Sequence, residues 1–93
     1  MANDAKVPQL DFNAFVLSLG SSALIHLGLA PDPVSREKQP ANLALAQQSI
    51  DLLALLQEKT RGNLSDDEAR LLESLLFDLR MRFVETAQAG AKK

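Results

Sequence analysis

The only histidine of the chain, His26, is the side chain best suited to acid–base or metal chemistry near neutral pH. It has no companion for either role, because the chain has no cysteine and no second histidine. The nearest acids in the sequence, Asp11 and Asp32, lie about two turns or more away along a helix. We therefore interpret His26 as a hydrogen-bonded residue at a helix or subunit contact.

Serines precede His26 at positions 18, 21 and 22, but no catalytic base, nucleophile elbow or oxyanion-hole motif accompanies them. The consecutive acids from Asp66 to Glu68 point around a helix and not toward one cation, so they are better explained as helix-capping residues. Nucleotide-binding motifs are also absent. We expect no catalytic residue, no metal ligand and no cofactor, and we expect the protein not to be an enzyme.

The composition is that of one small globular domain. The chain has 93 residues, of which 46% are hydrophobic and 24% charged, with a net charge of -2. Basic residues are spread along the chain, and the aromatic residues are four phenylalanines within apolar segments, so nucleic acid is not an expected partner. The lack of cysteine fits a reducing compartment, and we expect the cytoplasm.

Residues 11–29 predict an unusually apolar helix, since no Asp, Glu, Lys or Arg occurs from Phe12 to Pro31. A membrane span is disfavoured by Asn13, the serines and His26, and by the lack of basic flanking residues. An export signal is disfavoured by the long leader, which carries acidic residues. We predict a soluble helix buried by more than one neighbour, and we do not expect membrane contact.

Two further helices are predicted over residues 42–61 and 65–87, separated from the first by a proline-rich loop at 30–41. Asp11 and Asn42 are suitable N-caps, and Ser65 with Glu68 forms a capping box. Glycines at 28 and 62 favour helix ends. Charged residues on the outer side of the third helix are spaced for pairing: Asp66, Arg70 and Glu73, then Asp78, Arg82 and Glu85.

The predicted fold is all-α, with the helix at 11–29 packed on an antiparallel hairpin of the other two helices. Residues 1–10 are expected to be a disordered tail and residues 88–93 a frayed one. Three helices cannot bury all the apolar surface among themselves, so we predict a homodimer and a dimeric helical bundle. The candidate interface consists of small residues, one histidine and one arginine: Ser18, Gly20, Ser21, Ser22, His26 and Arg80.

The stretches FVLSLGSSALIHLG, PDP and QEKTRGNLSDDEARLLESLLFDLRMRF together resemble a family of small bacterial proteins, the domain of unknown function eighteen-forty-four. The resemblance runs from about Phe12 to Val84. It implies a compact helical protein of the bacterial cytoplasm, and it brings no catalytic residue, cofactor or partner. Phe83 departs from the tyrosine that related sequences often carry there, which removes a polar contact.

Two functional classes remain open. The first is a non-enzymatic module for protein–protein interaction or self-association. The second is a ligand-binding or membrane-associated accessory protein, in which the first helix lies against lipid or lines an apolar cavity with His26 as its polar contact.

Overall fold

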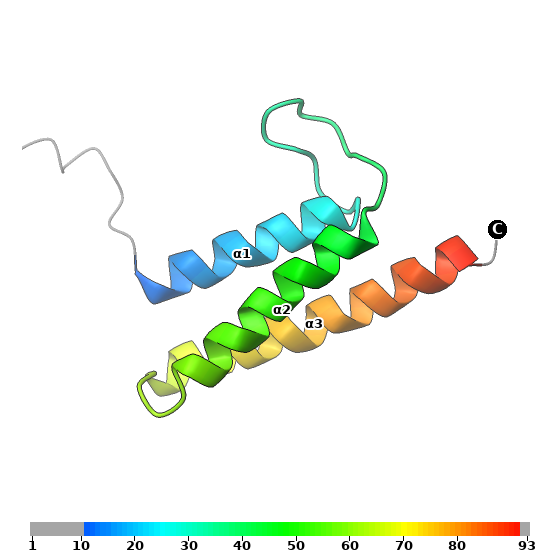
Figure 1. The fold of residues 1–93 in the computed structure, drawn as a ribbon. Coiled ribbons are helices and arrows are strands. Elements are labelled where there is room, and N and C mark those ends of the chain that lie inside the picture. The colour runs from blue at the N-terminus through cyan, green and yellow to red at the C-terminus, as the bar shows by residue number, and fades with distance from the viewer. Residues whose placement is uncertain (1–10, 92–93) are drawn as a thin grey trace, which may run out of the picture.

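The computed structural model describes residues 11–91 and contains three helices (Figure 1). They are α1 (Phe12–His26), α2 (Leu43–Lys59) and α3 (Asp66–Ala91). Within the described range there is no strand, only an isolated bridge between Pro31 and Lys38. The prediction of an all-α protein with three helices is confirmed. The tail predicted over residues 1–10 and the last two residues of the chain lie outside the described range.

The helices begin at the predicted capping residues. The Asp11 and Asn42 side chains each accept a hydrogen bond from a backbone N–H three residues later, at 2.8 and 3.1 Å. At the start of α3 the Glu68 N–H donates to Ser65 Oγ at 3.2 Å, and the Ser65 N–H donates to Glu68 Oε1 at 2.8 Å. This reciprocal pair is the predicted capping box.

Two helices end earlier than predicted and one ends later. Helix α1 stops at His26, before the predicted residue 29, because Leu27 caps it and Gly28 adopts a left-handed conformation with φ 78°. Helix α2 stops at Lys59, before residue 61, because Thr60 is its C-cap and Gly62 has φ 88°.

Helix α3 runs past the predicted end at 87 to Ala91, so residues 88–91, which we expected to be frayed, are part of the helix. The segment from 84 to 91 holds no proline and several good helix formers, so the backbone hydrogen-bond ladder can continue. Gly90 lies within the last turn and has open space around it.

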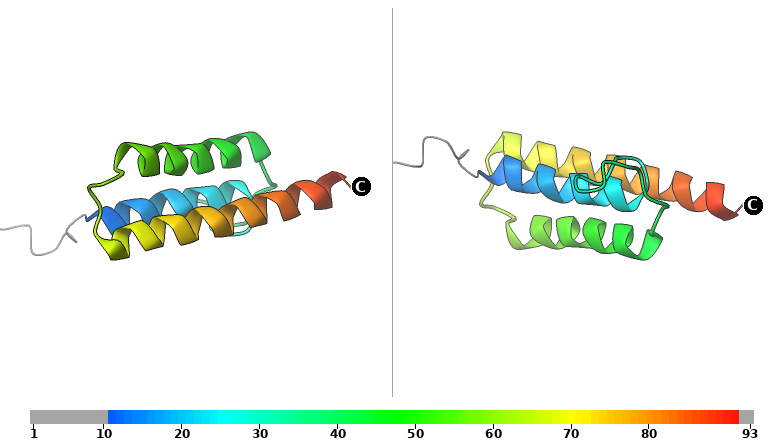
Figure 2. Two further views of the ribbon diagram at one scale, coloured as in Figure 1. Left: turned by 90° about the horizontal axis from the view of Figure 1, so that it is seen from below. Right: turned by 90° about the horizontal axis from the view of Figure 1, so that it is seen from above.

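The three helices alternate in direction, so that α2 runs opposite to both α1 and α3 (Figure 2). All three pairs of helices are in contact, and α1 packs more extensively on α2 than on α3. The C-terminal part of α3 extends beyond the other two helices (Figures 1 and 2).

The core takes one stripe from each helix. Its buried members are Val16, Ala23, Ile50, Leu53, Leu72, Leu76 and Leu79. Burial of such a side chain stabilises the fold by roughly 1.5–3 kcal/mol. Helix α1 has two neighbours, as predicted for a helix buried by more than one, but its outer side is open: Leu17 is 50% exposed, and Ala14, Ser18 and Ser21 are also exposed.

The loop between α1 and α2 is organised by Asp32. Its Oδ1 accepts hydrogen bonds from the N–H groups of Val34 (2.7 Å) and Ser35 (3.4 Å). Its backbone N–H donates to the Glu37 carbonyl at 2.9 Å, and its own carbonyl accepts from Arg36 at 2.7 Å. Asp32 also lines a hollow together with residues from the end of α1 and the start of α2.

Candidate interaction surface on helices α1 and α2

Gly20, one of the predicted interface residues, is buried inside the chain. A Cβ built on Gly20 would lie 2.9 Å from Leu75 Cδ2, so the glycine lets α1 approach α3 closely. The small residue at this position therefore allows two helices of the same chain to pack closely. Gly20 does not lie on a surface that a second chain could contact.

The three predicted interface serines have different surroundings. Ser18 and Ser21 are exposed, and the Ser18 hydroxyl donates to the Phe15 carbonyl of its own helix at 2.8 Å. Ser22 is half-buried. It lies about one turn after Leu19 and two turns after Phe15, on the side of α1 that borders α2. Ser22 is therefore the serine that shares a helix side with the groove described below.

His26 is half-buried at the end of α1, in an open hollow with Ile25, Asp32 and Leu45 among its lining residues. Its backbone carbonyl accepts a hydrogen bond from the Asn42 N–H at 2.6 Å. Within residues 11–91 the imidazole makes no hydrogen bond to another residue, and our interpretation of His26 as a hydrogen-bonded residue at a helix or subunit contact stays a prediction.

Arg80 does not join the other predicted interface residues. It is exposed on α3 and lines a separate hollow with Gln57 and Phe77. The structure therefore divides the six candidates among four places. Gly20 lies inside the chain, Ser18 and Ser21 lie on the outer side of α1, Ser22 and His26 lie on the side of α1 that borders α2, and Arg80 lies on α3.

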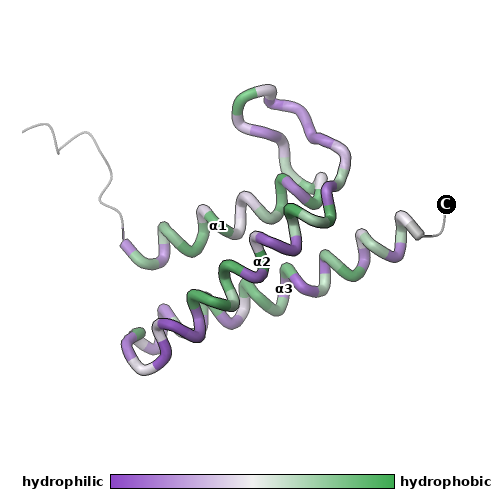
Figure 3. The backbone as a smooth tube through the Cα atoms, viewed as in Figure 1, coloured by the Kyte–Doolittle hydropathy of each residue, from purple (hydrophilic) through white to green (hydrophobic). Residues whose placement is uncertain are grey.

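A groove between α1 and α2 is the most apolar surface feature near these residues. It has a volume of about 360 Å³ and is lined by Phe15, Leu19, Leu52, Leu55, Leu56 and Lys59. Leu52 and Leu55 are 47% and 50% exposed, which is unusual for large apolar side chains on neighbouring turns. Figure 3 shows the hydrophobic colouring of α1 and of much of α2 beside a mostly hydrophilic loop.

Sequence reasoning missed this groove because α2 carries two adjacent apolar stripes. Helical periodicity does not distinguish which of the two is covered, whereas the structure buries Ala46, Ile50 and Leu53 and leaves Leu45 and Leu52 exposed. The signal was present as the spacing of Leu52, Leu55, Leu56 and Lys59 on successive turns.

The groove and the hollow at His26 lie at opposite ends of one continuous side of the molecule. On α1 this side contains Phe15, Leu19, Ser22 and His26; on α2 it contains Leu45, Leu52, Leu56 and Lys59. We call these residues, together with Leu55 and the adjoining Asp32, the α1–α2 face. Lys59 is the only charged residue lining the groove, and Asp32 is the only acidic residue lining the hollow.

Helix α3 carries a second exposed apolar surface. Phe77, Met81 and Val84 are 68%, 48% and 49% exposed and follow one another at helical spacing. Beside them the Asp78 carboxylate accepts a hydrogen bond from Arg82 Nε at 2.8 Å and raises the pKa of that guanidinium. The pairing predicted between Asp78 and Arg82 is confirmed.

Near the start of α3, Arg70 forms an ion pair with a different residue from those whose spacing we noted. Arg70 lies 3.1 Å from Asp67 and does not pair with Asp66. Both side chains are largely exposed, so the pair contributes little to stability.

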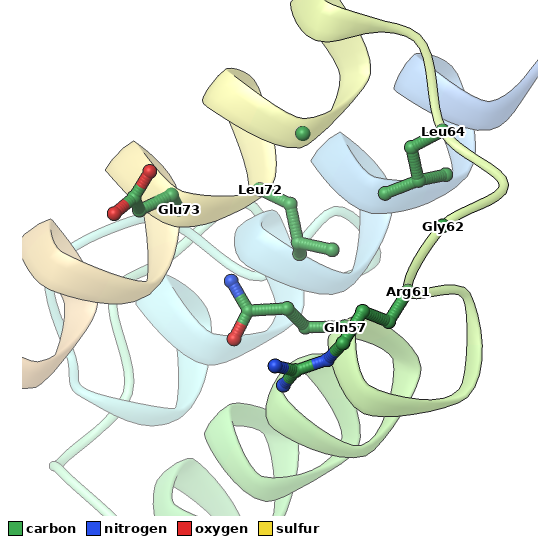
Figure 4. A pocket seen from close by; sticks show the side chains of 7 residues that line it. Gln57, Arg61, Gly62, Leu64, Leu72 and Glu73 are labelled. Carbon is green, nitrogen blue, oxygen red and sulfur yellow. The ribbon is translucent and has the colours of Figure 1, made fainter.

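The turn between α2 and α3 holds a more polar hollow of about 370 Å³ (Figure 4). Leu64 and Leu72 lie between the helices, Gln57 and Arg61 lie on one side, and the Glu73 carboxylate is directed away from Arg61 (Figure 4). The residues lining this hollow include one carboxylate, Glu73, and no serine, threonine or histidine. Over residues 11–91 no three His, Asp or Glu side chains gather where they could hold a metal ion.

The sequence model of the domain of unknown function DUF1844 matches residues 9–85, which is most of the chain. The chain belongs to the DUF1844 family. The resemblance that the motifs indicated is therefore confirmed over nearly the same range. No curated protein and no solved structure matches this DUF1844 chain. In the described part of the DUF1844 protein, no helix combines the length and hydropathy needed to cross a bilayer.

Proposed function

We propose that this DUF1844 protein is a non-enzymatic interaction module that associates through its α1–α2 face, with a second copy as its first partner. The observation that carries the proposal is the groove of exposed Leu52, Leu55 and Phe15 side chains. Contiguous apolar surface of this kind is typical of sites that bind another protein. Chains of this size also gain stability from association, because they bury a smaller fraction of their surface than larger domains do.

The second candidate function is a ligand-binding accessory protein. The groove is near the lower end of the volumes that small-molecule sites have, roughly 300–1,000 Å³. The groove is an open one, and His26, the polar contact that we expected for such a ligand, lines the hollow at the other end of the face. An apolar ligand in the groove would thus keep much of its surface in water, which favours a polypeptide as the occupant.

Sedimentation equilibrium of the purified chain over micromolar to submillimolar concentrations tests the proposal. We expect reversible association, weakened at least tenfold by Leu52→Asp because the substitution places a charge in the apolar groove. Met81→Asp is the matched control, since Met81 has nearly the same exposure, 48% against 47%, but lies on α3. A monomeric mass throughout the range would refute self-association.

Flotation with neutral and anionic lipid vesicles separates the second candidate. The interaction module stays with the soluble fraction, whereas a membrane-associated protein floats and loses this property in Leu52→Asp. We propose the cytoplasm as its location, on the basis of the cysteine-free sequence.

A further inference from the structure

The two ends of the α1–α2 face carry opposite charges. Lys59 lies at the groove end beside Phe15, and Asp32 lies at the hollow end beside His26. At 1.5 Å per residue, the ends are about 16 Å apart along α1 and about 21 Å apart along α2. That separation exceeds the screening length of about 8 Å at physiological ionic strength, so the two charges do little for each other within one chain.

Both charges have no ionic partner in the described part of the chain. Lys59 is exposed, and neither it nor Asp32 takes part in an ion pair within residues 11–91. Asp32 Oδ1 is occupied by backbone N–H donors, and the same bonds hold the carboxylate in place beside Leu45 and His26. An acid held by the loop at one end and an exposed lysine at the other suit a partner with the reverse order of charges.

A second copy of this chain has that reverse order when it is turned about a two-fold axis. A two-fold axis perpendicular to the helices reverses the direction of each helix, so the groove end of one copy lies over the hollow end of the other. From this we infer that two chains pair face to face through α1 and α2, with Lys59 of each copy against Asp32 of the other. The inference rests on the proposed function and specifies its partner, its surface and its symmetry.

The middle of the face fits such a pairing. Ser22 lies between Leu19 and His26 on α1, and Leu52 lies midway between Leu45 and Lys59 on α2. Helix α1 contains no Asp, Glu, Lys or Arg, so two α1 helices can meet without burying such a charge. The apolar stripe on α3 is the weaker alternative, because the Asp78 and Arg82 charges beside it already satisfy each other.

The decisive experiment compares dimer dissociation constants of the full chain and three variants: Lys59→Glu, Asp32→Asn and the two together. Asparagine keeps the side-chain oxygen that accepts from the loop N–H groups, so the loop remains folded. Lys59→Glu places a glutamate of each copy against Asp32 of the other. We expect the dimer dissociation constant to rise about tenfold or more. Adding Asp32→Asn removes the facing charge, so the double variant should dimerise several-fold more tightly than Lys59→Glu alone.

Arg61→Glu is the control, because it makes the same change of charge two residues away. Arg61 lines the hollow at the turn between α2 and α3 and lies outside the α1–α2 face, so the dimer dissociation constant should not change. Far-UV circular dichroism checks that every variant retains its helices. A dimer that is insensitive to Lys59→Glu, or that Asp32→Asn fails to rescue, overturns this two-fold arrangement while self-association stands. A chain that never dimerises refutes the proposed self-association itself.

A second measurement uses the absence of cysteine in the chain. Ser22→Cys introduces one thiol near the inferred axis with little change of volume, and a short bismaleimide should join two copies in high yield. Met81→Cys on α3 should give little product. The reverse pattern would place the interface on α3 and overturn the inference.

Discussion

Gly20 of α1 and Leu75 of α3 lie so close that a methyl group on the glycine would sit 2.9 Å from Leu75 Cδ2. This contact sets the approach of α1 to α3, because any side chain at position 20 enters the space that Leu75 occupies. It also explains why glycine, a poor helix former, occurs in the interior of α1.

Substitution of Gly20 should show the consequence. Gly20→Val is expected to lower the free energy of unfolding by about 1–3 kcal/mol through overpacking. Gly20→Ala should change it less, because alanine gains about 1 kcal/mol in helix propensity and the Leu75 side chain can shift. Chemical denaturation measures both.

The control for this site is the double variant Gly20→Val with Leu75→Ala. Shortening Leu75 makes room for the valine, so the loss in the double variant should be smaller than the sum of the two single losses. Additive losses would show that the two residues do not share this space.

Gly28 is the second glycine whose replacement should be costly. It has φ 78°, and a Cβ there would lie 2.9 Å from the Gln39 carbonyl oxygen, a backbone atom that cannot move aside easily. We expect Gly28→Ala to destabilise the chain by about 2–3 kcal/mol. Gly62 has a similar φ of 88°, but a Cβ there would have nothing within 4 Å. Gly62→Ala should therefore lower the free energy of unfolding by only about 1 kcal/mol. Equal losses in thermal or chemical unfolding would contradict the steric part of the explanation.

The neighbouring residues Leu52 and Leu53 separate the core from the face. Leu53 is fully buried, so Leu53→Ala should lower the free energy of unfolding by about 2–5 kcal/mol. Leu52 is 47% exposed, so Leu52→Ala should lower it by less than about 1 kcal/mol at concentrations where the chain is monomeric. Urea unfolding at low protein concentration makes the comparison, and a large loss for Leu52→Ala would place that side chain in the core.

The start of α3 depends on its capping box. Ser65→Ala removes the acceptor for the Glu68 N–H and should cost about 0.5–2 kcal/mol. Ser21→Ala is the control, since Ser21 is exposed in the middle of α1 and alanine is the better helix former. If the two variants unfold at the same temperature, the capping box contributes nothing measurable.

Local sequence was sufficient to predict the three helices and where they begin, and it placed the ends of α1 and α2 within three residues. The caps at Asp11, Asn42 and Ser65 depend on hydrogen bonds within a few residues, and the left-handed exits at Gly28 and Gly62 depend on backbone sterics. Such features are written in adjacent residues and need no knowledge of the rest of the fold. The late end of α3 was missed because no residue there forces a stop.

Only the tertiary structure decided which apolar residues face the core. The stripes of α2 that contain Leu52 and Leu53 are both rich in apolar residues, and which of them is buried depends on where α1 and α3 pack. The same packing turned Gly20 inward and brought Phe15 beside Leu55 and Lys59, and it set Asp32 next to His26. Helical periodicity groups residues of one helix by side, but which side is covered depends on contacts between residues that are distant in the sequence.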